Sequence, residues 1–277
     1  METREFAILK KLRLETGKKI DTNFSGTYRS AFKGYGLLFE SVREYISGDD
    51  VRNIDWNVSA RMNHLYVREY VEERELSVVL MVDVSASSYF GISRTKSDVI
   101  LEFVTLILYL IQMNNDRVSI LLFSSRVEKF LKPKKGRKFV LKVLDEIINT
   151  VPQEKGTDIS FAVDYLGRVI KKRSIVFVVS DFMDNKSDYL NRLKILLRKH
   201  DIIPVQVFDP MEKGMFLPGL TELYDLESGE SFYSDLSDNK CDLTDTGFPG
   251  TIRLSTVEPI EVEVLNFFEK RKKGRFL

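Results

Sequence analysis

Short apolar runs alternate with longer amphipathic stretches between residues 76 and 208. Buried strands are predicted for four runs rich in β-branched residues, at 77–83, 117–123, 175–180 and 202–208. Helices are predicted between and after them at 95–113, 137–149, 158–171 and 186–199. Strands that alternate with helices predict an α/β fold with a mostly parallel sheet and helices on both faces.

One connection in this pattern is too short for a parallel crossover. The segments "RVSILLF" and "RVEKFLK" are separated only by Ser124 and Ser125, so they can pair only as an antiparallel hairpin, which we expect at the edge of the sheet.

Beyond residue 210 the alternation of strands and helices is less clear. A hairpin excursion is expected near residues 216–250, around "LTELYDLESGESFYSD", and a closing helix in "TVEPIEVEVLNFFEKRKKG".

The first 75 residues lack this alternation of apolar strands and amphipathic helices. A short amphipathic helix is predicted at 5–15, and the Gly/Ser/Thr-rich stretch "DTNFSGTYRSAFKGYG" predicts a loop or irregular strand. A densely charged section follows at 41–75. We therefore expect residues 1–75 to form a small N-terminal α+β subdomain packed on the core, and residues 76–277 to form the sheet domain.

Charge and cysteine content narrow the class of protein. The 42 Lys and Arg residues nearly balance the 41 Asp and Glu residues, which does not favour a nucleic-acid-binding protein. A lone cysteine excludes an intrachain disulfide and fits a reducing compartment. We see no signal peptide, and the longest apolar stretch, 99–113, is shorter than the ~20 residues of a membrane span and contains Glu102. A cytoplasmic protein is expected.

Oxygen-bearing side chains stand where the predicted strands end. The first strand is followed by Asp83, Ser85 and Ser87, and Asp181 follows "SIVFVVS". Thr157 lies at the start of a predicted helix. Because ligands bind at the carboxyl ends of parallel strands, these side chains predict a site for a hard cation, Mg²⁺ or alternatively Mn²⁺ or Ca²⁺. The absence of nearby histidine and cysteine from the pattern disfavours zinc.

The Asp-x-Ser-x-Ser motif with a distant threonine and aspartate resembles the metal-ion-dependent adhesion site (MIDAS) of von Willebrand factor A domains. The resemblance implies a von Willebrand A-like, Rossmann-type fold and an ion that binds a carboxylate (Asp or Glu) of a protein partner. Ser88, Tyr89 and Asp158 are then expected at the rim that a partner contacts. Two alternatives stay open: such residues also cap helices or form turns, and the site could be formed but unused.

A second resemblance lies in the charged section. The sequence resembles the bacterial domain-of-unknown-function family 58, a von Willebrand A-like family associated with MoxR-type AAA ATPases. The positions that carry this resemblance are Arg43, Tyr45, Gly48, Asp49, Asp50, Arg52, Ile54, Asp55, Trp56, Ala60, Arg61, Val67, Arg68 and Glu69. The usual methionine after the last serine is replaced by Ser88-Tyr89. The resemblance implies a MoxR-type ATPase as partner.

The charged section has two interpretations. It can be a small subdomain held by bidentate Arg–carboxylate pairs around a buried Trp56, which we favour, or a docking face for the ATPase through Arg43, Arg52 and Arg61.

Three functions follow from these observations. The first is a non-enzymatic, metal-dependent protein-binding module, an adaptor or co-chaperone of the ATPase in protein assembly or remodelling. The second is a metal-independent scaffold that binds through the N-terminal Arg/Asp-rich block. A metal-dependent phosphohydrolase is less favoured, because a second aspartate is needed two residues after Asp83 and Ser85 stands there. Neither a phosphate-binding Gly-x-x-x-x-Gly-Lys loop nor a Gly-x-Ser-x-Gly elbow is present.

Overall fold

Two compact units make up the chain. The computed structural model describes residues 22–32, 37–72, 75–91, 93–153, 156–184, 186–213, 220–224, 231–235, 248 and 250–274, and the helix predicted at 5–15 lies outside them. One unit comprises residues 1–31 and 77–277, and the other comprises residues 32–76. A boundary was expected at residues 75–76; the described helical segment 22–31, expected in the N-terminal subdomain, lies in the larger unit.

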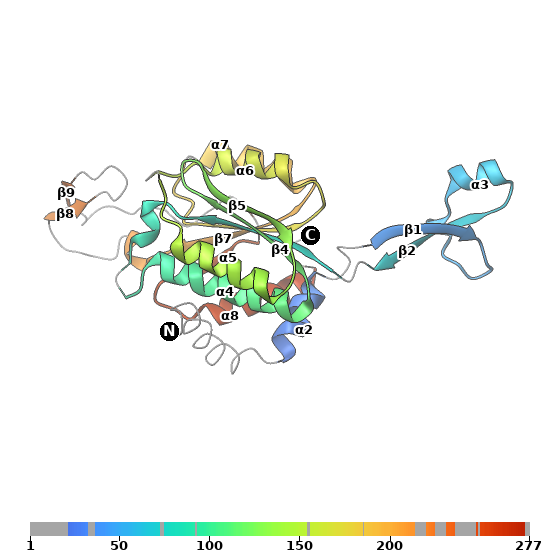
Figure 1. The fold of residues 1–277 in the computed structure, drawn as a ribbon, viewed down its shortest axis with the longest axis horizontal. Helices are drawn as coiled ribbons and strands as arrows, with labels where there is room; N and C mark the ends of the chain where they lie inside the picture. Colours follow the sequence, from blue (N-terminus) through green and yellow to red (C-terminus); the bar gives the residue numbers. More distant parts are fainter. Residues whose placement is uncertain are drawn as a thin grey trace. The chain divides into compact units, whose positions relative to one another are not determined.

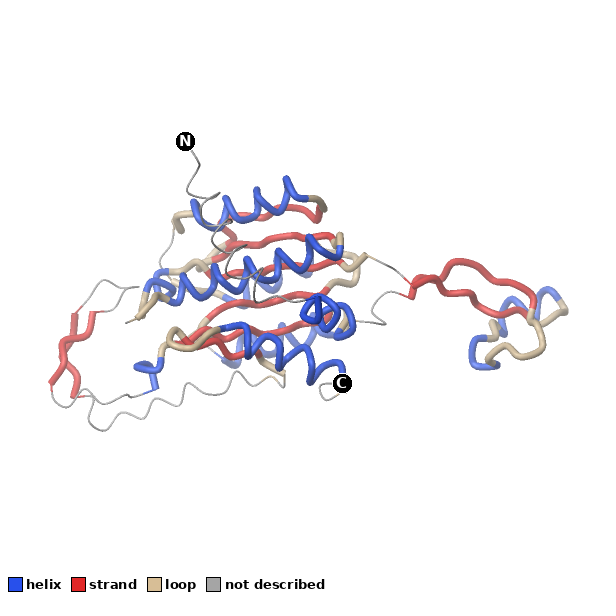
Figure 2. The backbone as a smooth tube through the Cα atoms, turned by 90° about the horizontal axis from the view of Figure 1, so that it is seen from below, coloured by secondary structure: helices blue, strands red, loops and turns tan. Residues whose placement is uncertain are grey.

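The larger unit is built on a six-stranded sheet in the order β10-β7-β6-β3-β4-β5. Figure 2 shows its strands running side by side with helices beside them. Its strands are β3 (Ser77–Asp83), β4 (Arg117–Phe123), β5 (Val127–Lys134), β6 (Ile175–Ser180), β7 (Asp201–Phe208) and β10 (Ile252–Ser255). Every neighbouring pair is parallel except β4 and β5, which form the predicted antiparallel edge hairpin. β10 was not predicted, because four residues are too few to show a periodicity.

Helices cover both faces of this sheet (Figure 1). The helices α6 (Ile159–Val169) and α7 (Lys186–Leu197) lie on one face, where they share a buried cluster with Val79 and Met81 of β3. The helices α4 (Lys96–Asn114), α5 (Arg137–Asn149) and α8 (Ile260–Lys272) lie on the other face. Because both faces are covered, the central strands are continuous apolar runs, as predicted.

The helix α4 has the length and composition of a membrane span, alone among the helices of the described residues. More than half of its apolar window is buried inside the protein, including Phe103, which packs edge-to-face on Phe177 of β6 at 5.7 Å. In this structure it is the core helix of the sheet domain.

The segment predicted as loop or irregular strand is partly a helix, α2 (Thr22–Ala31). Phe24 and Tyr28 lie one turn apart and pack edge-to-face on Phe268 of α8, with ring centroids 6.0 and 5.6 Å apart. Tyr28 is fully buried, and its hydroxyl donates to Asp116. The prediction was wrong because tertiary packing outweighed the weak helix propensity of this stretch.

The smaller unit is a two-stranded antiparallel sheet with a helical insertion. The strands β1 (Leu37–Glu44) and β2 (Tyr66–Glu72) pair from Leu37 opposite Glu72 to Glu44 opposite Tyr66. Between them lie a 3₁₀ turn, η1 (Val51–Asn53), and the helix α3 (Trp56–Met62). An α+β composition was expected for this region.

The hairpin predicted beyond residue 210 is also present. The strands β8 (Leu220–Tyr224) and β9 (Ser231–Asp235) pair antiparallel, with Tyr224 opposite Ser231.

Candidate functional site

Four of the predicted donors, Asp83, Ser85, Ser87 and Asp181, gather where the strand order reverses. From β3 the chain runs to β4 and β5 on one side of the sheet, then to β6, β7 and β10 on the other. In open α/β sheets such a reversal creates a crevice at the carboxyl ends of the two strands that flank it, here β3 and β6. Val82 is paired with Val179, so Asp83 and Ser180 end their strands at the same level.

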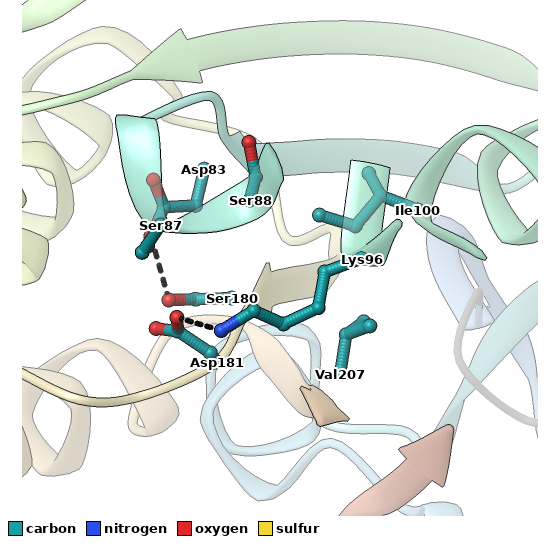
Figure 3. A pocket seen from close by; sticks show the side chains of 8 residues that line it. All are labelled: Asp83, Ser87, Ser88, Lys96, Ile100, Ser180, Asp181 and Val207. Carbon is teal, nitrogen blue, oxygen red and sulfur yellow. Dashed lines mark hydrogen bonds and ion pairs between the residues drawn. The ribbon is translucent and has the colours of Figure 1, made fainter. Parts of the chain in front are cut away.

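Asp83 is the centre of this cluster. It is buried, and its Oδ2 accepts a hydrogen bond of 2.7 Å from the Ser180 hydroxyl (Figure 3). Its Oδ1 accepts one of 2.9 Å from the backbone N–H of Ser85. Asp181, the next residue after β6, is also buried. Two carboxylates are therefore held at the tips of adjacent strands, with hydroxyls beside them.

The two serines after Asp83 lie close to each other. Ser85 precedes the 3₁₀ turn η2 (Ala86–Tyr89), which brings its hydroxyl oxygen to 3.1 Å from that of Ser87. Neighbouring ligands of an octahedral Mg²⁺ site stand about 2.9 Å apart, since each lies about 2.0–2.1 Å from the ion. The two hydroxyls therefore already have the spacing of adjacent ligands.

The loop that contains Thr157 is held by hydrogen bonds to the segments that follow β4 and β6, the two strands next to β3. The N–H of Asp158 donates to the carbonyl of Ser124, just after β4, and the N–H of Ile159 donates to Asp184, just after β6. The hydroxyl oxygen of Thr157 is buried and has no hydrogen-bond partner among the described residues. A buried hydroxyl without a partner costs free energy, which a bound ion or water would offset.

A lysine that the sequence analysis did not single out also lies in the site. Lys96 is 2% exposed, and its Nζ is 2.7 Å from Asp181 Oδ2 and 2.6 Å from Glu212 Oε1. Figure 3 shows its side chain extending toward Asp181 among the residues that line a small pocket. One signal was available: Lys96 is the first residue of α4, after the N-cap Thr95, where the helix dipole disfavours a cation.

Burial and charge shift the pKa values in this cluster. Burial, followed by the negative charge of Asp181, raises the pKa of Asp83 to about 7. Burial by itself would lower the pKa of Lys96, but the charges of Asp181 and Glu212 outweigh it and raise that pKa above its ordinary value. The ammonium is therefore charged, whereas the two strand-tip carboxylates repel each other.

The chemistry of these donors fits a hard divalent cation. Within the described part of the chain, no three His, Cys, Asp or Glu side chains are grouped as metal ligands. The candidate donors are instead the carboxylates and hydroxyls that the sequence predicted: Asp83, Asp181, Ser85, Ser87 and Thr157. The orphaned Thr157 hydroxyl and the repelling carboxylates are the features of this structure that a cation would satisfy.

The expected rim residues have different environments. Ser88 is buried, and its hydroxyl donates to the carbonyl of Ser85 at 2.7 Å, so it supports the serine loop and does not face a partner. Tyr89 is exposed. Asp158 caps α6 by accepting from the N–H of Phe161 at 2.8 Å.

The three arginines predicted as partner contacts all lie in the smaller unit. Arg43 pairs with Asp49 at 2.7 Å and Glu69 at 2.9 Å, and Arg52, which is largely exposed, pairs with Asp50 at 2.7 Å. Arg61 is exposed at the end of α3. The expected Arg–carboxylate pairs are therefore present in this unit.

The prediction of a buried Trp56 is wrong, because its side chain is 66% exposed. Asp55 is the N-cap of α3, where its carboxylate accepts from the N–H groups of Asn57 and Val58 and pairs with Arg68 at 2.8 Å. Asp55 therefore anchors this turn of chain, and Trp56 follows it on the exposed first turn of the helix.

Comparison with known proteins places this arrangement in a family. The family model described as "Protein of unknown function DUF58" matches residues 41–242. Uncharacterized proteins of Mycobacterium tuberculosis and Mycobacterium bovis are each 30% identical to this chain over 227 residues, which cover 80% of it and 71% of theirs.

Two solved structures are similar at low identity. BatB from Bacteroides thetaiotaomicron aligns over 72% of this chain and 99% of its own, with 12% identity and a TM-score of 0.48. A von Willebrand factor type A protein from Catenulispora acidiphila aligns over 75% of this chain and 44% of its own, with 11% identity and a TM-score of 0.42. The chain belongs to the DUF58 family of proteins of unknown function, and its larger unit has an α/β fold with a mostly parallel six-stranded sheet.

Proposed function

We propose that this chain is a non-enzymatic protein-binding module in which a divalent cation, Mg²⁺ or alternatively Mn²⁺ or Ca²⁺, binds at the tips of β3 and β6. The observation that carries the proposal is the convergence of Asp83, the Ser85–Ser87 hydroxyl pair and Asp181 at the reversal of strand order, beside a loop whose buried Thr157 hydroxyl has no partner among the described residues. A bound cation would offer an open coordination position to an Asp or Glu carboxylate of a protein partner.

The surrounding residues suit such a role. Hydroxyl ligands are neutral, so the serines and Thr157 would leave most of the charge of the ion uncompensated and attractive to an incoming carboxylate. Asp83 is oriented by Ser180 and by the Ser85 N–H, which keeps its carboxylate in one position. Tyr89 is exposed just after the serines, where a partner could contact it.

The partner class comes from the family resemblance. The DUF58 family is associated with MoxR-type AAA ATPases, and we propose that this chain acts as a chaperone-like adaptor of such an ATPase in protein assembly or remodelling. The match over residues 41–242 supports the family part of this proposal.

Metal dependence is tested by thermal unfolding of the full chain with Mg²⁺, with Mn²⁺ and with EDTA. A ligand at ~100 times its Kd stabilises the folded state by about 2.7 kcal/mol, so the wild type should melt at a clearly higher temperature with metal. Asp83→Asn should lose this gain, whereas Asp50→Asn, a control in the smaller unit, should keep it. A wild type that does not respond at millimolar metal would contradict the proposal.

The partnership is tested with the purified MoxR-type ATPase of the same organism. Wild type should bind it in Mg²⁺ and lose binding in EDTA, and Asp83→Asn should not bind in either condition. Equal binding of both proteins in both conditions would rule out a metal-dependent contact.

The smaller unit supports a second candidate, a metal-independent scaffold. Besides Trp56, it exposes Ile46, Val51 and Met62, which is unusual for so small a unit. If this unit carries partner binding, Trp56→Ala should weaken the ATPase complex while Asp83→Asn leaves it unchanged. The opposite pattern favours the metal site.

A further inference from the structure

A buried ammonium lies among the carboxylates of the candidate metal site. Lys96 contacts Asp181 and Glu212 at 2.7 and 2.6 Å, and both its own exposure and theirs are small. The pocket beside it is lined by Lys96 and by three of the predicted metal ligands, Asp83, Ser87 and Asp181 (Figure 3). Lys96 therefore lies next to these three ligands.

Helix formation does not account for this lysine. Its backbone occupies the first position of α4, where the partial positive charge of the helix end disfavours a second positive charge. The favourable interactions of its side chain come instead from two residues distant in sequence, 85 and 116 positions away.

The net charge of the cluster is negative enough to bind a divalent ion in addition to the lysine. Asp83, Asp181 and Glu212 carry three negative charges when ionised, and Lys96 carries one positive charge, which leaves −2. A divalent cation would bring the sum to zero. Since Lys96 and the ion would share Asp181, the ammonium opposes the ion both by repulsion and by holding its ligand.

Glu212 offers the ammonium a second anchor. It lies in the 3₁₀ turn η3 (Pro210–Lys213) after β7, where its other oxygen, Oε2, accepts from the N–H of Asp209 at 3.0 Å. Asp209 is held in turn by the hydroxyl of Thr256 at 2.6 Å. Glu212 therefore belongs to a fixed turn that can retain Lys96 when Asp181 is engaged elsewhere.

We propose that Lys96 is a built-in competitor of the divalent ion that sets the affinity of the site, and that Glu212 strengthens ion binding by drawing the ammonium away from Asp181. This inference rests on the proposed function, because it presupposes an ion at the tip of β3. It assigns to Lys96 and Glu212 the role of tuning residues that do not ligate the ion.

The test is calorimetric titration of Mg²⁺ and Mn²⁺ into four forms of the full chain. Lys96→Met should lower the Kd by about tenfold or more, because it removes a nearby positive charge from a buried site. Glu212→Gln should raise the Kd by roughly three- to tenfold, because the ammonium then has only Asp181 as an anionic partner. Lys129→Met, which removes a partly exposed lysine paired with Glu146, should leave the Kd unchanged.

The outcomes separate the inference from the proposed function. If wild type binds metal and folded Lys96→Met binds it equally or more weakly, the competitor role is overturned and the metal site stands. If only Lys96→Met binds metal, the lysine excludes the ion and the competitor role is supported, whereas metal-dependent function in the wild type is not. If neither binds, both ideas fail together. Should Lys96→Met not fold, Glu212→Gln decides, and an unchanged or lower Kd overturns the inference.

Discussion

Aspartates of the strand-tip cluster (Asp83 and Asp181, with Lys96 and Glu212) and of the smaller unit have pKa values shifted in opposite directions. At the strand tips, burial and the charge of Asp181 raise the pKa of Asp83 to about 7. In the smaller unit, the side-chain hydrogen bonds from Arg43 lower the pKa of Asp49 to about 2. The difference arises from burial and partners, not from the aspartate itself.

The two regions differ in whether the negative charge of their carboxylates is already neutralised within the protein or is left to attract a cation. Asp49 shares the Arg43 guanidinium with Glu69, and Asp50 pairs with Arg52; these groups are all partly exposed, so water also compensates their charges. At the strand tips one ammonium serves Asp181 and Glu212, and Asp83 beside them relies on hydroxyl and amide donors. Buried negative charge in excess of its cations is a cost to folding that a bound cation would remove.

The largest effect expected from this comparison is on stability. Lys96→Met should lower the free energy of unfolding by about 3–5 kcal/mol, because it leaves the buried carboxylate of Asp181 and the partly buried one of Glu212 without their cation. Arg52→Met, which breaks an exposed pair, should leave the urea midpoint nearly unchanged. Urea unfolding in EDTA measures both, and equal losses would contradict the idea that the buried Lys96 pairs contribute more to stability than the exposed Arg52–Asp50 pair.

A second expected effect is an unusual pH dependence of the metal-free protein. Asp83 keeps its proton up to about pH 7 in the folded state, but only to about pH 3.8 when unfolded. Folding therefore takes up a proton between these values, and the contribution of Asp83 to the free energy of unfolding falls as the pH rises through them, by about 1.4 kcal/mol per pH unit at most. Urea titrations in EDTA from pH 5 to 8 should show this slope in wild type and a weaker slope in Asp83→Asn.

The same carboxyl group predicts how metal binding depends on pH. An ion binds the deprotonated carboxylate, so stabilisation by Mg²⁺ should grow between pH 6 and 8. Thermal unfolding with a fixed Mg²⁺ concentration checks this, and a gain that shrinks toward pH 8 would be inconsistent with Asp83 as a ligand.

A smaller, local effect is expected at the cap of α3. Asp55→Ala removes the acceptor for the N–H groups of Asn57 and Val58, so these amides should exchange hydrogen faster. Exchange within β3 should stay the same, because Asp55 belongs to the other unit. Asp50→Ala is the matched control in the same unit and should leave Val58 protected.

The smallest effect on stability is expected at Tyr89. Tyr89→Ala should change neither the melting temperature nor the Kd for Mg²⁺, because the side chain is exposed, but it should weaken binding of the ATPase partner. Ile195→Ala, an exposed residue on α7, should leave that binding unchanged. Equal binding by both variants would remove Tyr89 from the proposed rim.

The sequence alone determined the central strands and most of the helices of the sheet domain. The bounds of β3, β4 and β6 agree with the prediction, because strands buried on both faces must be continuous apolar runs. The edge hairpin followed from the two-residue connection at Ser124 and Ser125. The sequence also indicated the candidate donors, since oxygen side chains at strand ends have a recognisable position in the pattern.

Only the tertiary structure decided which distant residues meet. The helix α2 forms because Tyr28 packs on Phe268, and Lys96 lies in the candidate site because α4 begins beside β6 and η3. The exposure of Trp56 likewise depends on how the Asp55 cap orients α3. The periodicity of a sequence indicates which side of a helix or strand is buried, but not which other element packs against that side. The sequence could therefore not show that Lys96 lies beside Asp181 and Glu212, among the candidate metal ligands, and not in solvent.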